Sequence, residues 1–177
     1  MKFTETAKWS RYVELQATGS FVERGGTTVA QDVLTGVLGE EFVRTAAHHA
    51  MTLEPGAEVA RSVLQLLRAP VAMQECWAVF QEPSSDDERR RLAVRLLASI
   101  CDETAEPWVL PILEDAAVEV AVGAVAVVAE IAMQGHLSAE QEDAYLARFL
   151  GDSRSEVREA AVGYRTALEH ERARQEK

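Results

Sequence analysis

The chain has 177 residues, with 29 acidic against 18 basic side chains and a formal net charge of −11 at pH 7. A chain of this length buries enough apolar surface to fold as one domain without disulfides or a structural metal. Its charge opposes binding to phosphate backbones, which disfavours nucleic-acid partners, and favours encounter with basic proteins.

Helix start signals recur along the chain, and no strand signal of comparable quality appears. Four segments fit the S/T-x-x-E/Q capping box, in which two side chains satisfy free backbone N–H groups of the first turn. The boxes begin at Thr28, Ser85, Ser138 and Ser153. Pro70 and Pro107 suit the first turn of two further helices. The predicted helices cover residues 5–17, 28–50, 57–68, 70–81, 86–101, 106–114, 116–134, 139–150 and 154–173.

Three stretches of the chain are not explained by helix start signals alone. Residues 116–134 are small and apolar, but Glu119 and Glu130 interrupt them, so we expect a buried helix rather than a membrane span or a strand. Residues 19–26 lie between glycines and fit a loop, a short extended piece or an irregular helix end. In the predicted first helix, Trp9 is expected to cover one end of the domain.

An L-x-D-x4-V motif occurs twice, 37 residues apart. Its positions are Leu113, Asp115 and Val120 in the first copy and Leu150, Asp152 and Val157 in the second. A period of roughly 40 residues is typical of a two-helix unit that buries its apolar face by stacking on a neighbour. The motif therefore predicts an all-α fold, a short solenoid of stacked antiparallel helical hairpins.

Residues 150–161, LGDSRSEVREAA, resemble the HEAT repeat, which has a Leu ending the first helix, an Asp in the turn and Val-Arg-x-Ala-Ala opening the second helix. Residues 113–128 keep the Leu, Asp and Val but have Ala121 where the arginine of the family would fall. The resemblance implies an armadillo-type α solenoid that holds another macromolecule, although some HEAT-like proteins are DNA glycosylases or bilin lyases. It predicts one domain over 1–177, with divergent helices over 1–56, HEAT-like hairpins over 57–173 and a frayed tail over 174–177.

Acidic residues are concentrated in one segment. Between Arg95 and Arg148 there are ten acidic residues and no Lys or Arg. Stacked repeats bring their connections and first turns to one edge, which predicts an acidic edge that binds a basic protein. The predicted contact residues are Asp102, Glu103, Glu106, Trp108, Glu140, Glu142 and Asp143. The alternatives are an acidic surface that serves solubility alone and core packing for Trp108.

Motifs for catalysis, cofactors and metals are not found: the sequence has no Gly-rich phosphate loop, nucleophile elbow, H-E-x-x-H or C-x-x-C. Cys76 and Cys101 lie in apolar runs and read as buried thiols, with a disulfide or metal pair as the alternative. Glu41, Arg44 and His48 share one helix face and form the candidate site of an alternative small-molecule or enzymatic function.

Residues 86–91 hold three acidic residues followed by three arginines. We expect ion pairs of Asp86 with Arg90 and of Asp87 with Arg91 on an exposed helix face, rather than a phosphate contact. The start of the chain has no uninterrupted apolar stretch, so a cytoplasmic location is expected. Together these observations predict a non-enzymatic interaction module without cofactor, nucleic acid or membrane partner, of the immunity or inhibitor type. A piece of a longer scaffold is a further alternative.

Overall fold

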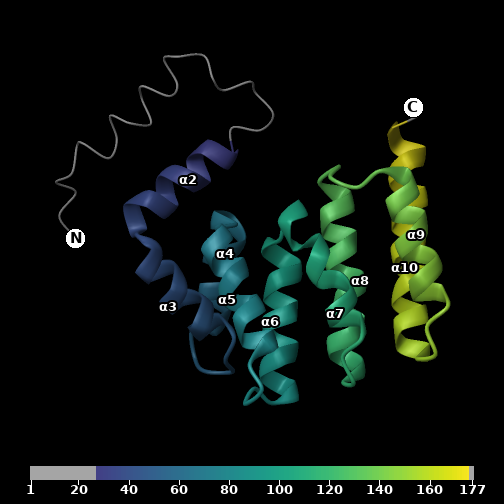
Figure 1. Ribbon diagram of the computed structural model, residues 1–177. Coiled ribbons are helices and arrows are strands. Elements are labelled where there is room, and N and C mark those ends of the chain that lie inside the picture. Colours follow the sequence, from purple (N-terminus) through teal and green to yellow (C-terminus); the bar gives the residue numbers. More distant parts are fainter. Residues whose placement is uncertain (1–26, 176–177) are drawn as a thin grey trace.

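The computed structural model describes residues 27–175, which form helices, turns and loops without any strand (Figure 1). The helix predicted over 5–17, with Trp9, and the stretch 19–26 lie outside the described residues. The α-helices are α2 Thr27–Leu38, α3 Glu40–Ala50, α4 Ala57–Leu67, α5 Pro70–Gln81, α6 Asp87–Ile100, α7 Val109–Leu113, α8 Val118–Met133, α9 Ala139–Leu150 and α10 Ser155–Gln175. A 3-10 helix, η1 Glu103–Trp108, precedes α7.

Two predicted helices are each divided in the structure. The segment 28–50 forms α2 and α3, separated at Gly39, whose φ of 85° is rarely adopted by residues with a side chain. The segment 106–114 forms the end of η1 and then α7, and Pro107 lies inside η1. At the C-terminus, α10 continues to Gln175, so residues 174 and 175 are helical rather than frayed.

The helix starts follow local chemistry, with corrections to the predicted caps. Thr28 lies inside α2, and Arg154 rather than Ser153 precedes the first residue of α10, so neither predicted box is in the capping position. Ser138 and Gln141 form the complete capping box at the start of α9, and Pro70 is in the first turn of α5. The predicted box at Ser85 is wrong, because Asp86 caps α6 by accepting a 2.8 Å hydrogen bond from the backbone N–H of Arg89.

The arginines of α6 pair with acidic residues one position closer in the sequence than predicted. Asp87 contacts Arg90 at 2.5 Å, and Glu88 contacts Arg91 at 2.7 Å, both with i,i+3 spacing. Asp86 is occupied in capping the helix, so its predicted pairing with Arg90 does not form. The predicted exposed, salt-bridged helix face is thus present, with a different register of pairs.

Helices that follow one another pack in pairs: α3 on α4, α5 on α6, α7 on α8, and α9 on α10. The second helices also contact across pairs, α4 with α6, α6 with α8, and α8 with α10. Figure 1 shows the result as a row of helices running from α4 to α10. The fully buried side chains include Leu64, Met73, Leu96, Ile112, Ile131 and Phe149.

Helix α8 lies in the middle of this row. Eight of its sixteen residues are buried, and it contacts α6, α7, α9 and α10. Residues 116–134 therefore contain a helix, as predicted, and not a strand. Among the described helices, none has the length and apolarity needed to cross a membrane. Gly123 allows α8 to approach α6 closely, because a Cβ at this position would lie 2.2 Å from Val94 Cγ1.

The two aspartates of the repeated motif hold equivalent places. Asp115 accepts a 2.8 Å hydrogen bond from the N–H of Ala117, and Asp152 accepts one of 2.9 Å from the N–H of Arg154. Their cationic partners differ. Asp115, with its side chain 6% exposed, pairs with Arg90 of α6 at 3.1 Å. Asp152 pairs with Arg154 at 2.8 Å. Arg158, the position equivalent to Ala121, does not pair with the Asp152 carboxylate but donates to the backbone oxygens of Asp152 and Ser153, both at 2.8 Å.

Both cysteines are buried and free, as their apolar surroundings predict. Burial raises the pKa of the Cys76 thiol far above its usual range and that of Cys101 to about 12. Both side chains therefore stay protonated at neutral pH and pack as small apolar groups.

Candidate functional site

The acidic edge predicted from the sequence draws on η1 and the start of α9, which the structure brings together. Glu106 of η1 accepts hydrogen bonds from the Gln141 side-chain amide at 3.3 Å and from the Tyr145 hydroxyl at 3.2 Å. Asp102 caps η1 by accepting from the N–H of Thr104 at 2.9 Å. Residues more than 30 positions apart in the chain therefore share this edge.

The predicted contact residues differ in exposure. Glu103, Glu140 and Asp143 are exposed, whereas Asp102 and Glu106 are half-buried. Glu142 is only 9% exposed. A partner that docks on the edge therefore cannot reach Glu142 without a rearrangement, and we remove this residue from the predicted contact set. Glu103 is also close to a histidine, with 3.3 Å from its carboxylate to His136 Nε2.

Trp108 is half-buried and belongs to an aromatic stack on the same side of the molecule. Its ring lies 5.0 Å from that of Trp77, with an interplanar angle of 5°, and Trp77 stacks on Phe80 at 5.1 Å. Trp77 is itself half-buried and packs against the hydrophobic core. The stack holds the Trp108 ring against Trp77, and part of the Trp108 side chain remains exposed.

Tyr145 connects the edge to α9. Burial, and then the negative charge of Glu106 and the hydrogen bond to it, raise the pKa of Tyr145 to about 12. The hydroxyl therefore remains protonated at neutral pH and continues to donate to Glu106. This neutral contact ties η1 to α9 without supplying a positive charge that would weaken the acidic field.

The alternative set at His48 is arranged differently from the prediction. His48 Nε2 lies 3.0 Å from a carboxylate oxygen of Glu75, and Arg44 pairs with the other oxygen of the same carboxylate. Glu41 is exposed, and the second acidic partner of Arg44 is Glu40 at 3.7 Å. The carboxylate that organises this cluster is Glu75 of α5, which ties α3 to α5.

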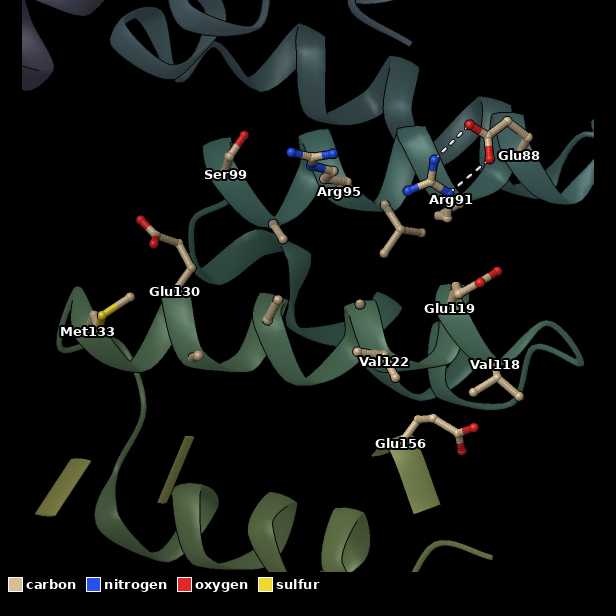
Figure 2. Close-up of a pocket in the computed structure, with 15 residues that line it drawn as sticks. Glu88, Arg91, Arg95, Ser99, Val118, Glu119, Val122, Glu130, Met133 and Glu156 are labelled. Carbon is tan, nitrogen blue, oxygen red and sulfur yellow. Dashed lines mark hydrogen bonds and ion pairs between the residues drawn. The ribbon is translucent and has the colours of Figure 1, made fainter. Parts of the chain in front are cut away.

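A third feature, absent from the sequence prediction, is a groove between α6 and α8 with a volume of about 840 Å³ (Figure 2). A second groove of about 1190 Å³ lies between α8 and α10. The two share one stripe of α8, spaced at four, three and four residues, which consists of Val122, Ala126, Ala129 and Met133. Met133 is 68% exposed, although half of the residues of α8 are buried.

The sequence contains one signal that could have indicated these grooves. The stripe on α8 has helical spacing and holds two alanines, as a groove floor requires. Glu119 and Glu130 lie on the same side of α8 as Ala126 and mark the side that stays open. The neighbours α6 and α10 turn this open side into the two grooves.

No protein-family model matches the chain, and comparisons with curated proteins and with solved structures gave no match. Over residues 27–175, no group of three or more His, Cys, Asp or Glu side chains is placed to hold a metal ion. The candidate site is therefore defined by its own geometry, namely an acidic edge beside an aromatic stack, with an apolar groove elsewhere on the molecule.

Proposed function

We propose that the protein is a non-enzymatic interaction module that binds a basic protein partner through its acidic edge. The proposed contacts are Asp102, Glu103, Glu106, Glu140 and Asp143, with Trp108 as an aromatic neighbour. The observation that carries the proposal is the pair of hydrogen bonds from Gln141 and Tyr145 to Glu106, because they hold the acids of η1 against those of α9.

The charge distribution supports this proposal. The ten acidic residues between Arg95 and Arg148 have no Lys or Arg among them. At physiological ionic strength charges are screened over about 8 Å, so acids of neighbouring elements act together on an approaching cation. Such a field speeds association with a basic surface and repels phosphate backbones.

The fold proposed for this module is a short HEAT-like solenoid of stacked hairpins. The pairing of consecutive helices and the contacts among α4, α6, α8 and α10 support it. So do the equivalent hydrogen bonds of Asp115 and Asp152, 37 residues apart. Within this proposal the most specific version is an immunity or inhibitor protein, small and acidic, that covers the cationic surface of a toxin or nuclease.

The test compares two pairs of charge reversals that change the net charge equally. Glu103→Lys with Asp143→Lys alters the edge, whereas Glu41→Lys with Glu159→Lys alters exposed acids elsewhere. Immobilised wild-type protein is incubated with cell extract at low salt and eluted with salt. The eluted partner is identified by mass spectrometry and its affinity for each variant is measured by calorimetry.

We expect a basic partner whose affinity falls at least about tenfold in the edge variant and less than about threefold in the control, with a steep dependence on salt. An equal loss in the two variants would show that net charge alone attracts the partner. A captured partner that is not basic, or one indifferent to the edge variant, would exclude the proposed function.

A further inference from the structure

The groove between α6 and α8 is built to receive an elongated apolar object. Its floor is formed by small or branched apolar residues, among them Val94, Ala98, Gly123 and Ala126. Glu119 and Glu130 mark the two ends of its α8 wall. They are eleven residues apart, which corresponds to about 17 Å along a helix, or about three helical turns.

The two walls of this groove carry opposite charges. Arg91 and Arg95 project from α6, and Glu119 and Glu130 line the opposite wall on α8 (Figure 2). Arg91 is already paired with Glu88, and Glu130 with Arg68 at 2.6 Å. Arg95 and Glu119 are exposed, and within residues 27–175 neither forms a hydrogen bond or an ion pair. Arg95 is therefore available to an acidic group of a ligand, and the exposed Glu119, whose charge also contributes to the raised pKa of Arg91, can face a basic group.

We propose that this groove binds an amphipathic helix of a partner protein. The apolar stripe of that helix lies on Gly123 and Ala126, its acidic flank faces Arg95, and its basic flank faces Glu119. A helix suits the groove because it satisfies its own backbone hydrogen bonds, whereas a peptide that binds by β-augmentation needs the free edge of a sheet. The described part of the chain has no strand that could offer such an edge.

The floor residues fit this occupant. Ala126 is small and exposed, so a second helix can approach α8 there, and the exposed Met133 at the end of the stripe adapts its unbranched side chain to different apolar surfaces. The complementary charges select the partner, since a helix with like charges on both flanks meets repulsion from one wall. This site is separate from the acidic edge and does not depend on the function proposed above.

The experiment uses the whole protein and a displayed library of 14-residue amphipathic helices in three classes. Their flanks are acidic and basic, both basic, or both acidic. Enriched helices are synthesised with a fluorescent label, and their affinities are measured by anisotropy. Ala126→Trp fills the groove, and Ala144→Trp places the same ring at an exposed alanine of α9 as a matched control.

We expect the class with one acidic and one basic flank to be enriched, with affinity reduced at least about tenfold by Ala126→Trp and less than about twofold by Ala144→Trp. Arg95→Glu alone should weaken binding about fivefold or more. The double variant Arg95→Glu/Glu119→Arg should restore the affinity. It exchanges the charges of the two walls, so the same helix can bind in the opposite direction with each flank facing a wall of opposite charge. Circular dichroism confirms that each variant is folded, and the exposed Arg95 position provides a test if Ala126→Trp is not.

Several results would overturn the proposal. They are no enrichment in any class, preference for helices with two basic flanks, and binding unaffected by Ala126→Trp or by Arg95→Glu. A wild-type dimer that Ala126→Trp converts to a monomer in sedimentation would show that a second copy covers the groove. A basic partner that binds through the acidic edge should still bind Ala126→Trp, so the two proposals can fail independently.

Discussion

Helices α8 and α10 occupy matching places in consecutive pairs of helices but are held by different forces. Helix α8 is enclosed by neighbours on both sides and buries eight of its sixteen residues. Helix α10 is at the end of the row, and its buried residues between 155 and 170 are Val157, Ala161 and Tyr164. Apolar packing therefore holds α8 in position, whereas α10 buries fewer apolar side chains and gains less stability from packing.

The first turn of α10 compensates with polar contacts. The Arg154 guanidinium donates hydrogen bonds to the backbone oxygens of Leu113 at 2.6 Å and Asp115 at 2.8 Å. It also donates to both carboxylate oxygens of Asp152. Arg158 donates to the backbone oxygens of Asp152 and Ser153, both at 2.8 Å. The end of the row is thus fastened to the preceding turn by charge-assisted hydrogen bonds.

Removal of the Arg154 side chain should have the largest effect. Arg154→Ala leaves two carbonyl oxygens without the guanidinium donor, and the Asp152 carboxylate, which is 12% exposed, keeps only the backbone N–H of residue 154. We expect the free energy of unfolding to fall by about 2–4 kcal/mol, because a partly buried charge loses its partner. Urea denaturation followed by circular dichroism measures the change.

The control is Arg154→Lys. Lysine keeps the positive charge but cannot donate hydrogen bonds to the Asp152 carboxylate and to both carbonyl oxygens of the preceding turn at the same time. It should recover less than half of the lost stability. Full recovery would mean that the positive charge suffices and that the fork geometry contributes nothing. An unchanged free energy in Arg154→Ala would show that α10, like α8, is held by packing alone.

The counterpart in α8 is Gly123→Ala. Glycine in a helix interior ordinarily costs about 0.5–1 kcal/mol relative to alanine. Here the new Cβ would lie 2.2 Å from Val94 Cγ1, in a side chain that is 1% exposed. Overpacking costs about 1–3 kcal/mol and outweighs the propensity gain. We therefore expect a net loss of about 1–2 kcal/mol, measured by urea denaturation.

A double-mutant cycle with Val94→Ala tests the cause. In the Val94→Ala background the clash is absent, so Gly123→Ala should become neutral or stabilising. The same loss in both backgrounds would mean that the methyl group of Val94 is not the obstacle, and that α6 and α8 are farther apart than the structure shows.

The sequence predicted those parts of the fold that depend on near neighbours in the chain. The box of Ser138 and Gln141, and Pro70 in the first turn of α5, act within four residues and appear as expected. The break at Gly39 was missed, because a glycine inside an apolar pattern is also compatible with a continuous helix. The cap at Asp86 was missed because Ser85, one residue earlier, fits the same motif.

Contacts between residues that are distant in the chain could not be predicted from the sequence. The pairing of Asp115 with Arg90 joins positions 25 residues apart, and the role of Glu75 with Arg44 and His48 joins α3 to α5. The edge was anticipated because charge is visible in composition, but the burial of Glu142 was not. The groove was missed because Glu119 and Glu130 were interpreted only as interruptions of an apolar run, although their spacing of eleven residues puts both on the side of α8 that stays open.

Acid should weaken α10 specifically. Hydrogen bonds from Arg154, and its positive charge, hold the pKa of Asp152 at about 2, below the usual value for an aspartate. A carboxyl with a depressed folded-state pKa adds stability that is present above its unfolded pKa, near 3.9, and is lost as the pH falls toward 2. The stability difference between wild type and Asp152→Asn should therefore be constant above about pH 5 and shrink between about pH 4 and 2. A difference independent of pH in urea titrations would contradict this.

The smallest effect should come from Gly163→Ala in α10, the same substitution as in α8 but with the opposite sign. A Cβ at Gly163 would have nothing within 4 Å, because the residue is exposed and lines the groove between α8 and α10. With no neighbour to displace, only the helix propensity changes, and the free energy of unfolding should rise by about 0.5–1 kcal/mol. Thermal unfolding of the two Gly→Ala variants beside wild type tests the contrast directly. If both variants were destabilised, α10 would be as closely packed at Gly163 as α8 is at Gly123, and the difference between the enclosed helix and the terminal helix would not hold.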